Sequence, residues 1–160
     1  LLVDVKPSDY YVNSVLDGLD YQEKYERLAY EISKDYKAPA NLVKEFLNDE
    51  VASSLRSIKT TYPHGLVFTD LNKCLPSFVV DTMKKGIVEF DKKLKGFAHP
   101  DAVMVGIESR SSCPIRIIRD ENRKASIDGI YPIGEGAGYA GGITSAALDG
   151  LLTAIMICKK

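Results

Sequence analysis

Five of the twelve glycines in this 160-residue chain fall between positions 134 and 142. The segment before them, residues 129–133, is apolar, and a long apolar run begins at Ile143. This order predicts a strand, a glycine-rich loop and the start of a helix. Because glycine lacks a Cβ atom, such a loop can adopt positive φ angles and bring its backbone close to another group. We therefore expect a tight turn that presents amide groups at the start of a helix.

The loop contains the segment Gly136-Ala-Gly138-Tyr-Ala-Gly141, which satisfies the G-x-G-x-x-G spacing of dinucleotide-binding loops. That motif normally continues through its helix into a second strand and an acidic residue roughly 20 residues further on. This sequence reaches Lys160 within the helix. We therefore expect the loop to complete a nucleotide-binding or flavin-binding fold, with the pyrophosphate-binding unit on another segment. A phosphate-binding loop of the Lys-Ser/Thr type is disfavoured because that ending is missing.

The composition excludes several classes of protein. A formal net charge of −1 and a hydrophobic fraction of 45% are typical of one compact soluble domain or two small lobes. The sequence has no basic stripe of the kind that nucleic-acid binders carry. Its longest apolar stretch is too short for a membrane span and it has no signal sequence, so no membrane association and a cytoplasmic location are predicted. Three widely spaced cysteines and two histidines predict neither a metal site nor a disulfide.

The first hundred residues have a mainly helical pattern. Apolar side chains recur three and four positions apart from Tyr21 to Tyr36, and more clearly from Pro76 to Leu94. A short helix is predicted from Pro39, because proline is favoured in the first helical turn. Two strands are also predicted in this half, over residues 1–6 and, at a sheet edge, over residues 66–68.

After residue 100 the pattern changes to short apolar runs, which predict strands over residues 102–107, 115–118 and 129–133. The last predicted helix, residues 143–158, is apolar on almost every side. Exposing each of its large side chains would cost about 1.5 to 3 kcal/mol, so the helix has to be covered. The sequence leaves two alternatives open. The helix lies either at the centre of this chain's own core or against a partner domain.

Two segments carry a resemblance to a known family. The stretch from Gly106 to Asp120, GIESRSSCPIRIIRD, and the stretch from Gly129 to Gly150, GIYPIGEGAGYAGGITSAALDG, resemble the C-terminal end of bacterial FAD-dependent dehydrogenases. The likeness is strongest over residues 102–154. Ser109 replaces the threonine usual in that family, and Ile133 replaces a commoner cysteine. The resemblance implies a glutathione-reductase-like FAD fold, in which an N-terminal fingerprint holds the ADP half and a late loop holds the ribityl and ring half.

The resemblance also implies roles for individual residues. Gly134 and Glu135 would occupy the position where an acidic side chain binds a ribityl hydroxyl. Backbone N–H groups at the start of the last helix would face the N1 and O2 edge of the flavin, where the reduced ring carries negative charge. Tyr139 would either cover the ring or fill the turn. The cofactor-binding residues predicted in this way are Gly134, Glu135, Gly136, Gly138, Tyr139, Gly141, Gly142, Ile143 and Arg110.

Charged residues precede the loop, and their role is open between two readings. Glu108, Arg110, Arg116 and Arg119 would form a structural network of salt bridges, since a charge among apolar strands needs a partner. Alternatively Arg110, with its planar guanidinium, would bind the flavin or an anionic substrate together with Ser111 and Ser112. No proton donor is identified, so no catalytic residue is predicted.

Taken together, the sequence predicts an α+β fragment. Residues 1–100 would form a helical inserted domain on the substrate side, and residues 101–160 the returning strands and final helix of an FAD-binding domain. The parent would be an FAD-dependent oxidoreductase, completed by an N-terminal FAD-binding segment and acting on a small molecule. The fragment alone is predicted to bind FAD weakly or not at all, to be inactive and to self-associate through its last helix. The alternative is a non-catalytic interaction module whose last helix docks on a partner.

Overall fold

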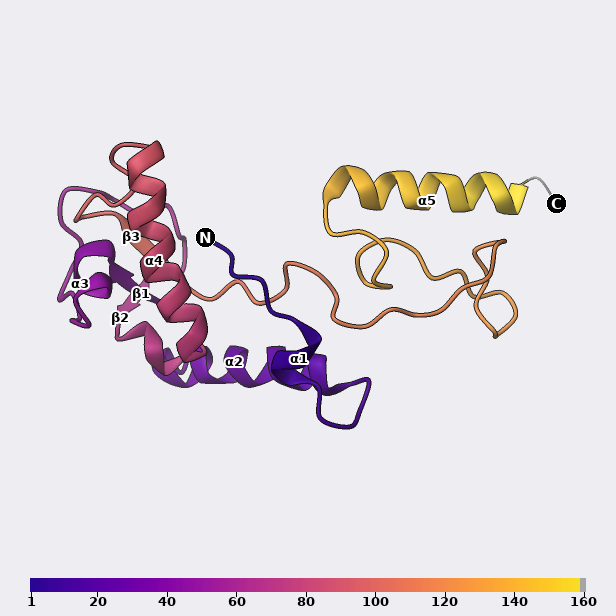
Figure 1. Ribbon diagram of the computed structural model, residues 1–160, viewed down its shortest axis with the longest axis horizontal. Coiled ribbons are helices and arrows are strands. Elements are labelled where there is room, and N and C mark those ends of the chain that lie inside the picture. The colour runs from indigo at the N-terminus through magenta and orange to yellow at the C-terminus, as the bar shows by residue number, and fades with distance from the viewer. Residues whose placement is uncertain (159–160) are drawn as a thin grey trace. The chain divides into compact units, whose positions relative to one another are not determined.

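The computed structural model describes residues 1–158, and the chain divides into two compact units. Unit 1 comprises residues 1–6 and 23–109, and unit 2 comprises residues 7–22 and 110 onward. Helices and a small mixed sheet together make an α+β fold (Figure 1). Within the described residues, no helix combines the length and apolar character needed to cross a membrane. The boundary predicted at residue 100 separates an inserted domain from part of an FAD-binding domain. The division into compact units does not test it, so it stays a prediction.

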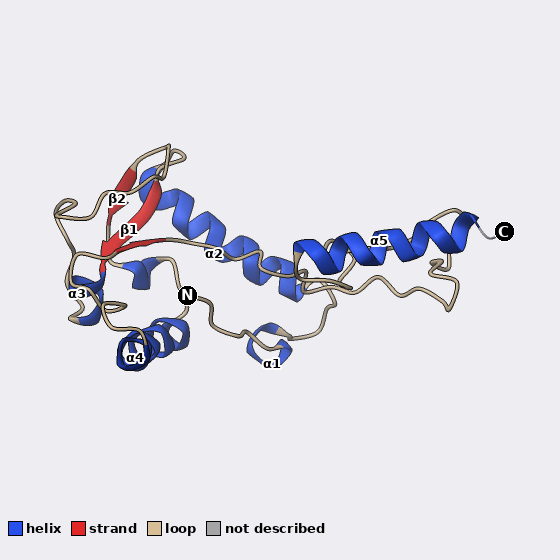
Figure 2. Cartoon of the chain, turned by 90° about the horizontal axis from the view of Figure 1, so that it is seen from above, coloured by secondary structure: helices blue, strands red, loops and turns tan. Residues whose placement is uncertain are grey.

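Unit 1 is built on a three-stranded sheet with β1, Ala38–Leu42, at its centre (Figure 2). β2, Leu66–Phe68, pairs with β1 in parallel, and β3, Val103–Val105, pairs with it antiparallel. Every residue of β1 is buried, and both of its edges are hydrogen-bonded to a neighbouring strand. The predicted edge strand at residues 66–68 and a strand within residues 102–107 are thereby confirmed.

Three helical segments complete the core of unit 1. α3 is a short helix, Val43–Leu47, η1 is a turn of 3₁₀ helix, Leu71–Lys73, and α4 runs over Ser77–Lys93. α4 confirms the amphipathic helix predicted from Pro76, which stands immediately before its first residue. A cluster of buried apolar side chains joins these segments, and its members are Val43, Phe46, Leu71, Cys74, Val80 and Ile87.

Unit 2 holds α1, Pro7–Tyr10, the first turns of α2, Asp17–Ser33, and α5, Ile143–Cys158. The carboxylate of Asp17 accepts hydrogen bonds from three backbone N–H groups just before α2, at distances of 2.8 to 3.0 Å. The predicted helix 143–158 is confirmed at both ends. Among the aliphatic and aromatic residues of unit 2 larger than alanine that the structure describes, proline excepted, none is buried, and the buried apolar side chains are those of Pro132 and Ala137.

Four local predictions were wrong. Residues 1–6 form no strand, and Pro39 lies inside β1 rather than at the start of a helix. Segments 115–118 and 129–133 form no regular strand either. A β-strand requires a ladder of hydrogen bonds to a neighbouring strand, whereas the backbone bonds described for segments 115–118 and 129–133 are isolated ones, such as that from the N–H of Ile117 to the carbonyl of Ala137 at 3.2 Å. At Pro39 the pairing of β1 with strands distant in sequence outweighs the local preference of proline for a helix start.

Candidate functional site

The glycine loop is a compact turn that depends on glycine at two positions. Gly134 has a φ angle of +67° and Gly138 a φ angle of +80°. Inside the turn, the N–H of Gly138 donates to the carbonyl of Glu135 at 2.9 Å and the N–H of Tyr139 to that of Gly134 at 3.0 Å. A Cβ atom on Gly138 would lie 2.3 Å from the carbonyl oxygen of Ile115. The absence of a side chain there allows the loop to lie directly against the segment before it.

Ser145, a residue of α5 itself, caps the first turn of this helix with its side chain. Ser145 Oγ accepts a hydrogen bond from the N–H of Gly142 at 3.2 Å and donates to the carbonyl of Gly142 at 2.9 Å. For Gly141 and Ile143, the part of the chain that the structure describes provides no acceptor for the backbone N–H. These two amides retain the donor capacity that helix starts offer to anions.

A carboxylate inside α5 accepts hydrogen bonds from two arginines and one backbone N–H. Arg119 donates to both oxygens of Asp149, at 2.8 and 2.9 Å, and Arg123 donates to Oδ1 at 2.6 Å. The backbone N–H of Gly134 donates to Oδ2 at 3.0 Å. Arg119 also donates to the carbonyl of Pro132 at 2.7 Å. One helix residue thus holds two arginines and the beginning of the glycine loop.

This arrangement shifts the acidity of its members. The bidentate hydrogen bonds from Arg119, followed by the backbone N–H of Gly134, hold the pKa of Asp149 well below its usual range. The carboxylate in turn raises the pKa of Arg119. Asp149 is therefore ionised at neutral pH, and its contacts are charge-assisted hydrogen bonds.

The ring of Tyr139 is held from several directions. The guanidinium carbon of Arg119 lies 3.6 Å from the ring centroid, and that of Arg116 lies 5.0 Å from it. The phenol hydroxyl donates to the carbonyl of Ile117 at 3.1 Å. These contacts favour the interpretation that Tyr139 fills the turn, since its ring already packs against arginine.

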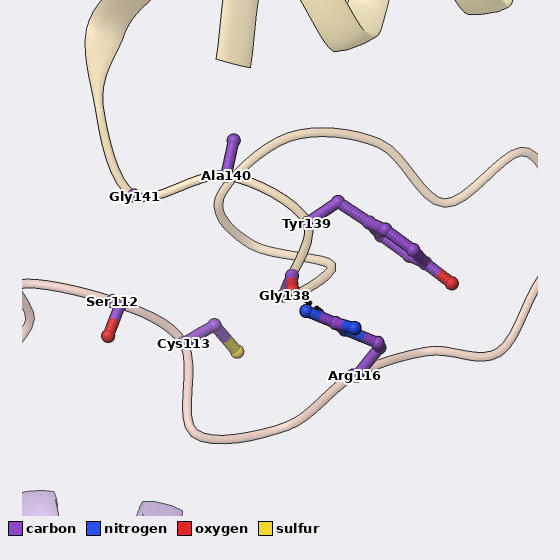
Figure 3. A pocket seen from close by; sticks show the side chains of 7 residues that line it. All are labelled: Ser112, Cys113, Arg116, Gly138, Tyr139, Ala140 and Gly141. Carbon is purple, nitrogen blue, oxygen red and sulfur yellow. Dashed lines mark hydrogen bonds between the residues drawn. The ribbon is translucent and has the colours of Figure 1, made fainter. Parts of the chain in front are cut away.

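A pocket of about 300 Å³ lies between two facing segments of unit 2 (Figure 3). One segment contributes Ser112, Cys113 and Arg116, and the glycine loop contributes residues 138–141. Arg116 reaches across to the loop, where its Nε donates to the carbonyl of Gly138 at 3.0 Å. The ring of Tyr139 is directed away from Ser112 and Cys113 in this view. The pocket lining contains one guanidinium and no carboxylate, so its electrostatics favour an anionic or electron-rich group.

The predicted site residues are not all brought together. Gly138, Tyr139 and Gly141 line the pocket, whereas Gly134 belongs to the contacts of Asp149. Glu135 and Gly136 are exposed, and the side chain of Ile143 is 93% exposed. The N–H of Gly142 is engaged by Ser145, so a ligand there would have to displace the serine hydroxyl. Arg110 is exposed and is not among the seven residues that line the pocket.

Sequence reasoning missed two residues of this region. Arg116, which the sequence assigned to a network of salt bridges, is the arginine that lines the pocket, and Asp149 accepts a hydrogen bond from the N–H of Gly134 at the start of the loop. One signal was available for Asp149, because it is the one charged residue between Ile143 and Cys158, and a charge within an apolar helix requires a partner. Among the described residues, no cluster of three potential metal ligands occurs.

α5 has an unusual distribution of polarity. Its buried side chain is Thr153, which is 2% exposed and donates to the carbonyl of Asp149 at 2.8 Å. Large apolar residues lie on the outside, and Leu151, for example, is 58% exposed. The exposed large apolar side chains of α5 are Ile143, Leu148, Leu151, Leu152, Ile155 and Ile157. The described part of unit 2 therefore does not bury these side chains in a core of its own.

Comparison with known proteins identifies the class of the chain. A family model described as "FAD-dependent protein, C-terminal domain-like" matches residues 1–111, which is more than half of the chain. The chain belongs to this family of C-terminal regions of FAD-dependent proteins. The match ends before the glycine loop, so the pocket and the contacts of Asp149 lie outside it.

A protein of Clostridium beijerinckii, named only as uncharacterized, is 45% identical to this chain over 166 residues. The alignment covers 100% of this chain and 30% of that protein. The chain thus spans less than a third of the length of this relative. The similarity extends over both units, including the glycine loop and α5.

Proposed function

We propose that this chain forms the ribityl-side and ring-side part of the FAD site in a flavin-dependent oxidoreductase. The observation that carries the proposal is the pocket between the glycine loop and residues 112–116, which lies beside the start of α5. Membership of an FAD-dependent protein family supports it. When bound, FAD would supply hydride and electron transfer, chemistry that no side chain lining this pocket can perform alone.

The residues present fit the chemistry of a flavin. Gly141 and Ile143 have backbone N–H groups available to an electron-rich edge, and Arg116 adds a positive charge at the pocket. A helix start next to flavin N1 stabilises the negative charge of the reduced ring. Gly134 and Glu135 keep their proposed place near the ribityl chain, with Glu135 exposed and able to turn toward a ligand. Arg116 replaces Arg110 as the arginine that we assign to the site.

The packing of unit 2 supports a site that another segment completes. Segments 115–118 and 129–133 are without strand partners among the described residues, and the large apolar residues of α5 are exposed. An apolar surface of this kind normally marks an interface. We propose that it packs against the remaining part of a longer FAD-dependent protein, because the relative extends well beyond the aligned region. That remaining part would hold the ADP half of FAD, in a glutathione-reductase-like fold within the cytoplasm.

Flavin titration tests the proposal. FAD is added to the 160-residue chain and to the longer protein, and binding is followed by flavin fluorescence and visible absorbance. We expect tight binding by the longer protein, and weak binding without oxidoreductase activity by the chain alone. In the longer protein, Arg116→Gln should weaken binding more than Arg110→Gln, a matched change outside the pocket lining. Absence of FAD from the longer protein would overturn the proposal.

A second candidate function is a non-catalytic interaction module, favoured by the exposed apolar residues of α5. In that case the glycine loop serves only packing, and α5 docks on a separate protein. The two functions differ in the light-scattering mass and flavin content of the longer protein. A longer protein without flavin that still covers α5, as shown by protection of Leu151 and its neighbours from exchange, would favour the interaction module. Self-association of the 160-residue chain through α5 is part of either proposal.

A further inference from the structure

Asp149 accepts hydrogen bonds from three residues that lie well before it in the chain. Arg119 and Arg123 come from the segment before the loop, and Gly134 begins the loop itself. The separations in sequence are 30, 26 and 15 residues. Side-chain exposure is only 11% for Arg119 and 12% for Asp149, so water screens this ion pair less than a surface pair. The carboxylate is the common acceptor of all three donors.

Arg119, which is paired with Asp149, also contacts residues at both ends of the loop. At the first end it donates to the carbonyl of Pro132 at 2.7 Å. At the other end its guanidinium packs 3.6 Å from the centroid of Tyr139. Tyr139 and Gly138 in turn contact residues 115–117, which include the pocket-lining residue Arg116. A guanidinium fixed by two carboxylate oxygens therefore fixes both edges of the turn.

The backbone of α5 is tied into the same group of contacts. Thr153 donates to the carbonyl of Asp149 at 2.8 Å, and Arg123 lies 3.3 Å from both that carbonyl and the Thr153 hydroxyl. These contacts hold Arg123 on the helix even though it belongs to a surface turn with a φ angle of +63°. The loop and α5 are thus joined through one residue near the middle of the helix.

We propose that Asp149 is a positioning residue, which fixes the glycine loop against α5 and so sets the position of the loop edge of the pocket. The consequence for flavin rests on the proposed function, whereas the ordering of the loop does not. Asp149 does not line the pocket. It acts through Gly134 at the start of the loop and through Arg119 at Tyr139.

Hydrogen exchange followed by mass spectrometry tests the ordering in the 160-residue chain. Asp149→Asn keeps the size of the side chain but removes the charge that both arginines share. We expect exchange over residues 132–142 to become about tenfold faster or more, as for the loss of a hydrogen bond to a charged group. Exchange of β1 in unit 1 should not change, which separates loop release from general unfolding.

Two further variants sharpen this test. Asp120→Asn is the matched control, because Asp120 also accepts a backbone hydrogen bond in unit 2, from Lys124 at 2.8 Å, but makes no contact with the loop. It should leave exchange over residues 132–142 unchanged. Arg119→Lys keeps the charge and loses the bidentate geometry, so it should accelerate exchange by less than Asp149→Asn. Equal exchange in wild-type chain and Asp149→Asn would overturn the proposal.

A second measurement addresses the flavin. In the longer protein, Asp149→Asn should raise the dissociation constant for FAD by about tenfold and shift the visible absorption bands of bound flavin, while Asp120→Asn leaves both unchanged. If the wild-type longer protein binds no FAD, the proposed function falls, and the exchange measurement still decides the role of Asp149. If FAD binds and Asp149→Asn leaves both affinity and spectrum as they were, positioning of the pocket is refuted while the proposed function stands.

Discussion

The guanidinium carbon of Arg119 lies 3.6 Å from the centroid of the Tyr139 ring, and the Tyr139 hydroxyl donates to the carbonyl of Ile117 at 3.1 Å. The two contacts act on different parts of the side chain. Arginine packing depends on the aromatic face, whereas the hydrogen bond depends on the hydroxyl. Substitutions can therefore separate them.

Tyr139→Phe removes the hydroxyl and keeps the ring. It should reduce the local opening free energy of residues 115–118 by about 0.5 to 1.5 kcal/mol, measured by native-state hydrogen exchange. Tyr139→Ala also removes the arginine packing and should reduce that free energy by about 0.5 to 1 kcal/mol more. Equal effects of the two variants would show that the packing of Arg119 on the ring contributes nothing.

Gly138→Ala introduces a Cβ atom 2.3 Å from the carbonyl oxygen of Ile115, at a φ angle of +80°. The left-handed backbone alone should lower the free energy of unfolding by about 1 to 3 kcal/mol, and the clash with a backbone atom should add to that loss. Gly136→Ala is the control, because its Cβ would meet nothing within 4 Å. Gly136→Ala should change stability by less than about 0.5 kcal/mol in urea unfolding followed by circular dichroism.

Two helical glycines should respond in opposite directions to alanine. Gly86 lies inside α4, where an added methyl group would meet nothing within 4 Å, so Gly86→Ala should raise the melting temperature through a gain of about 0.8 to 1 kcal/mol. At Gly18 in α2 the Cβ would lie 2.6 Å from Cβ of Pro114, so Gly18→Ala should lower stability. A stabilising Gly18→Ala would show that residue 18 does not pack tightly on Pro114.

Stability that depends on Asp149 should persist to low pH. Its folded pKa is depressed below the unfolded value of about 3.9, so its contribution is complete above that value and declines as pH falls toward the folded pKa. The difference in unfolding free energy between wild-type chain and Asp149→Asn should be constant from about pH 7 to pH 5 and shrink below about pH 4. Calorimetric melting at a series of pH values measures it. A difference that already disappears near pH 6 would contradict an ionised, arginine-paired Asp149.

The cysteines should differ in reactivity. Cys74 is completely buried, and burial, with a smaller effect from the charge of Asp70, raises the pKa of its thiol to about 11. Cys158 is exposed and Cys113 half-buried at the pocket. Iodoacetamide at pH 8 should therefore label Cys158 and Cys113, and should label Cys74 only after unfolding, as peptide mass spectrometry would show. Rapid labelling of Cys74 in the native chain would mean that the core of unit 1 opens readily.

Elements with strong local signals could be predicted from the sequence. The spacing of apolar residues in α4 and the apolar run that follows the glycines in α5 depend on neighbours within one or two turns, so the sequence contains the necessary information. The strand at Ala38–Leu42 could not be predicted in this way. Its partners lie near residues 66–68 and 103–105, and Pro39 within it suggests a helix start when only local preferences are considered.

The candidate site divides in the same manner. A turn that uses positive φ angles, and a helix start at Ile143, follow from the sequence, whereas the structure shows that Gly134 and Gly138 are the positions with positive φ. The choice of Arg116 over Arg110 at the pocket does not, because which arginine reaches the loop depends on the path of the chain between residues 110 and 120.

By itself, the sequence determined the glycine turn and the amphipathic and apolar helices, because local backbone freedom and side-chain periodicity decide these features. Only the tertiary structure decided which residues stabilise the turn. Asp149 meets Arg119 across 30 positions of sequence, and the apolar side chains of α5 lie outside while Thr153 lies inside. Contacts of this kind depend on the folded path of the backbone, and no local pattern of residues specifies that path.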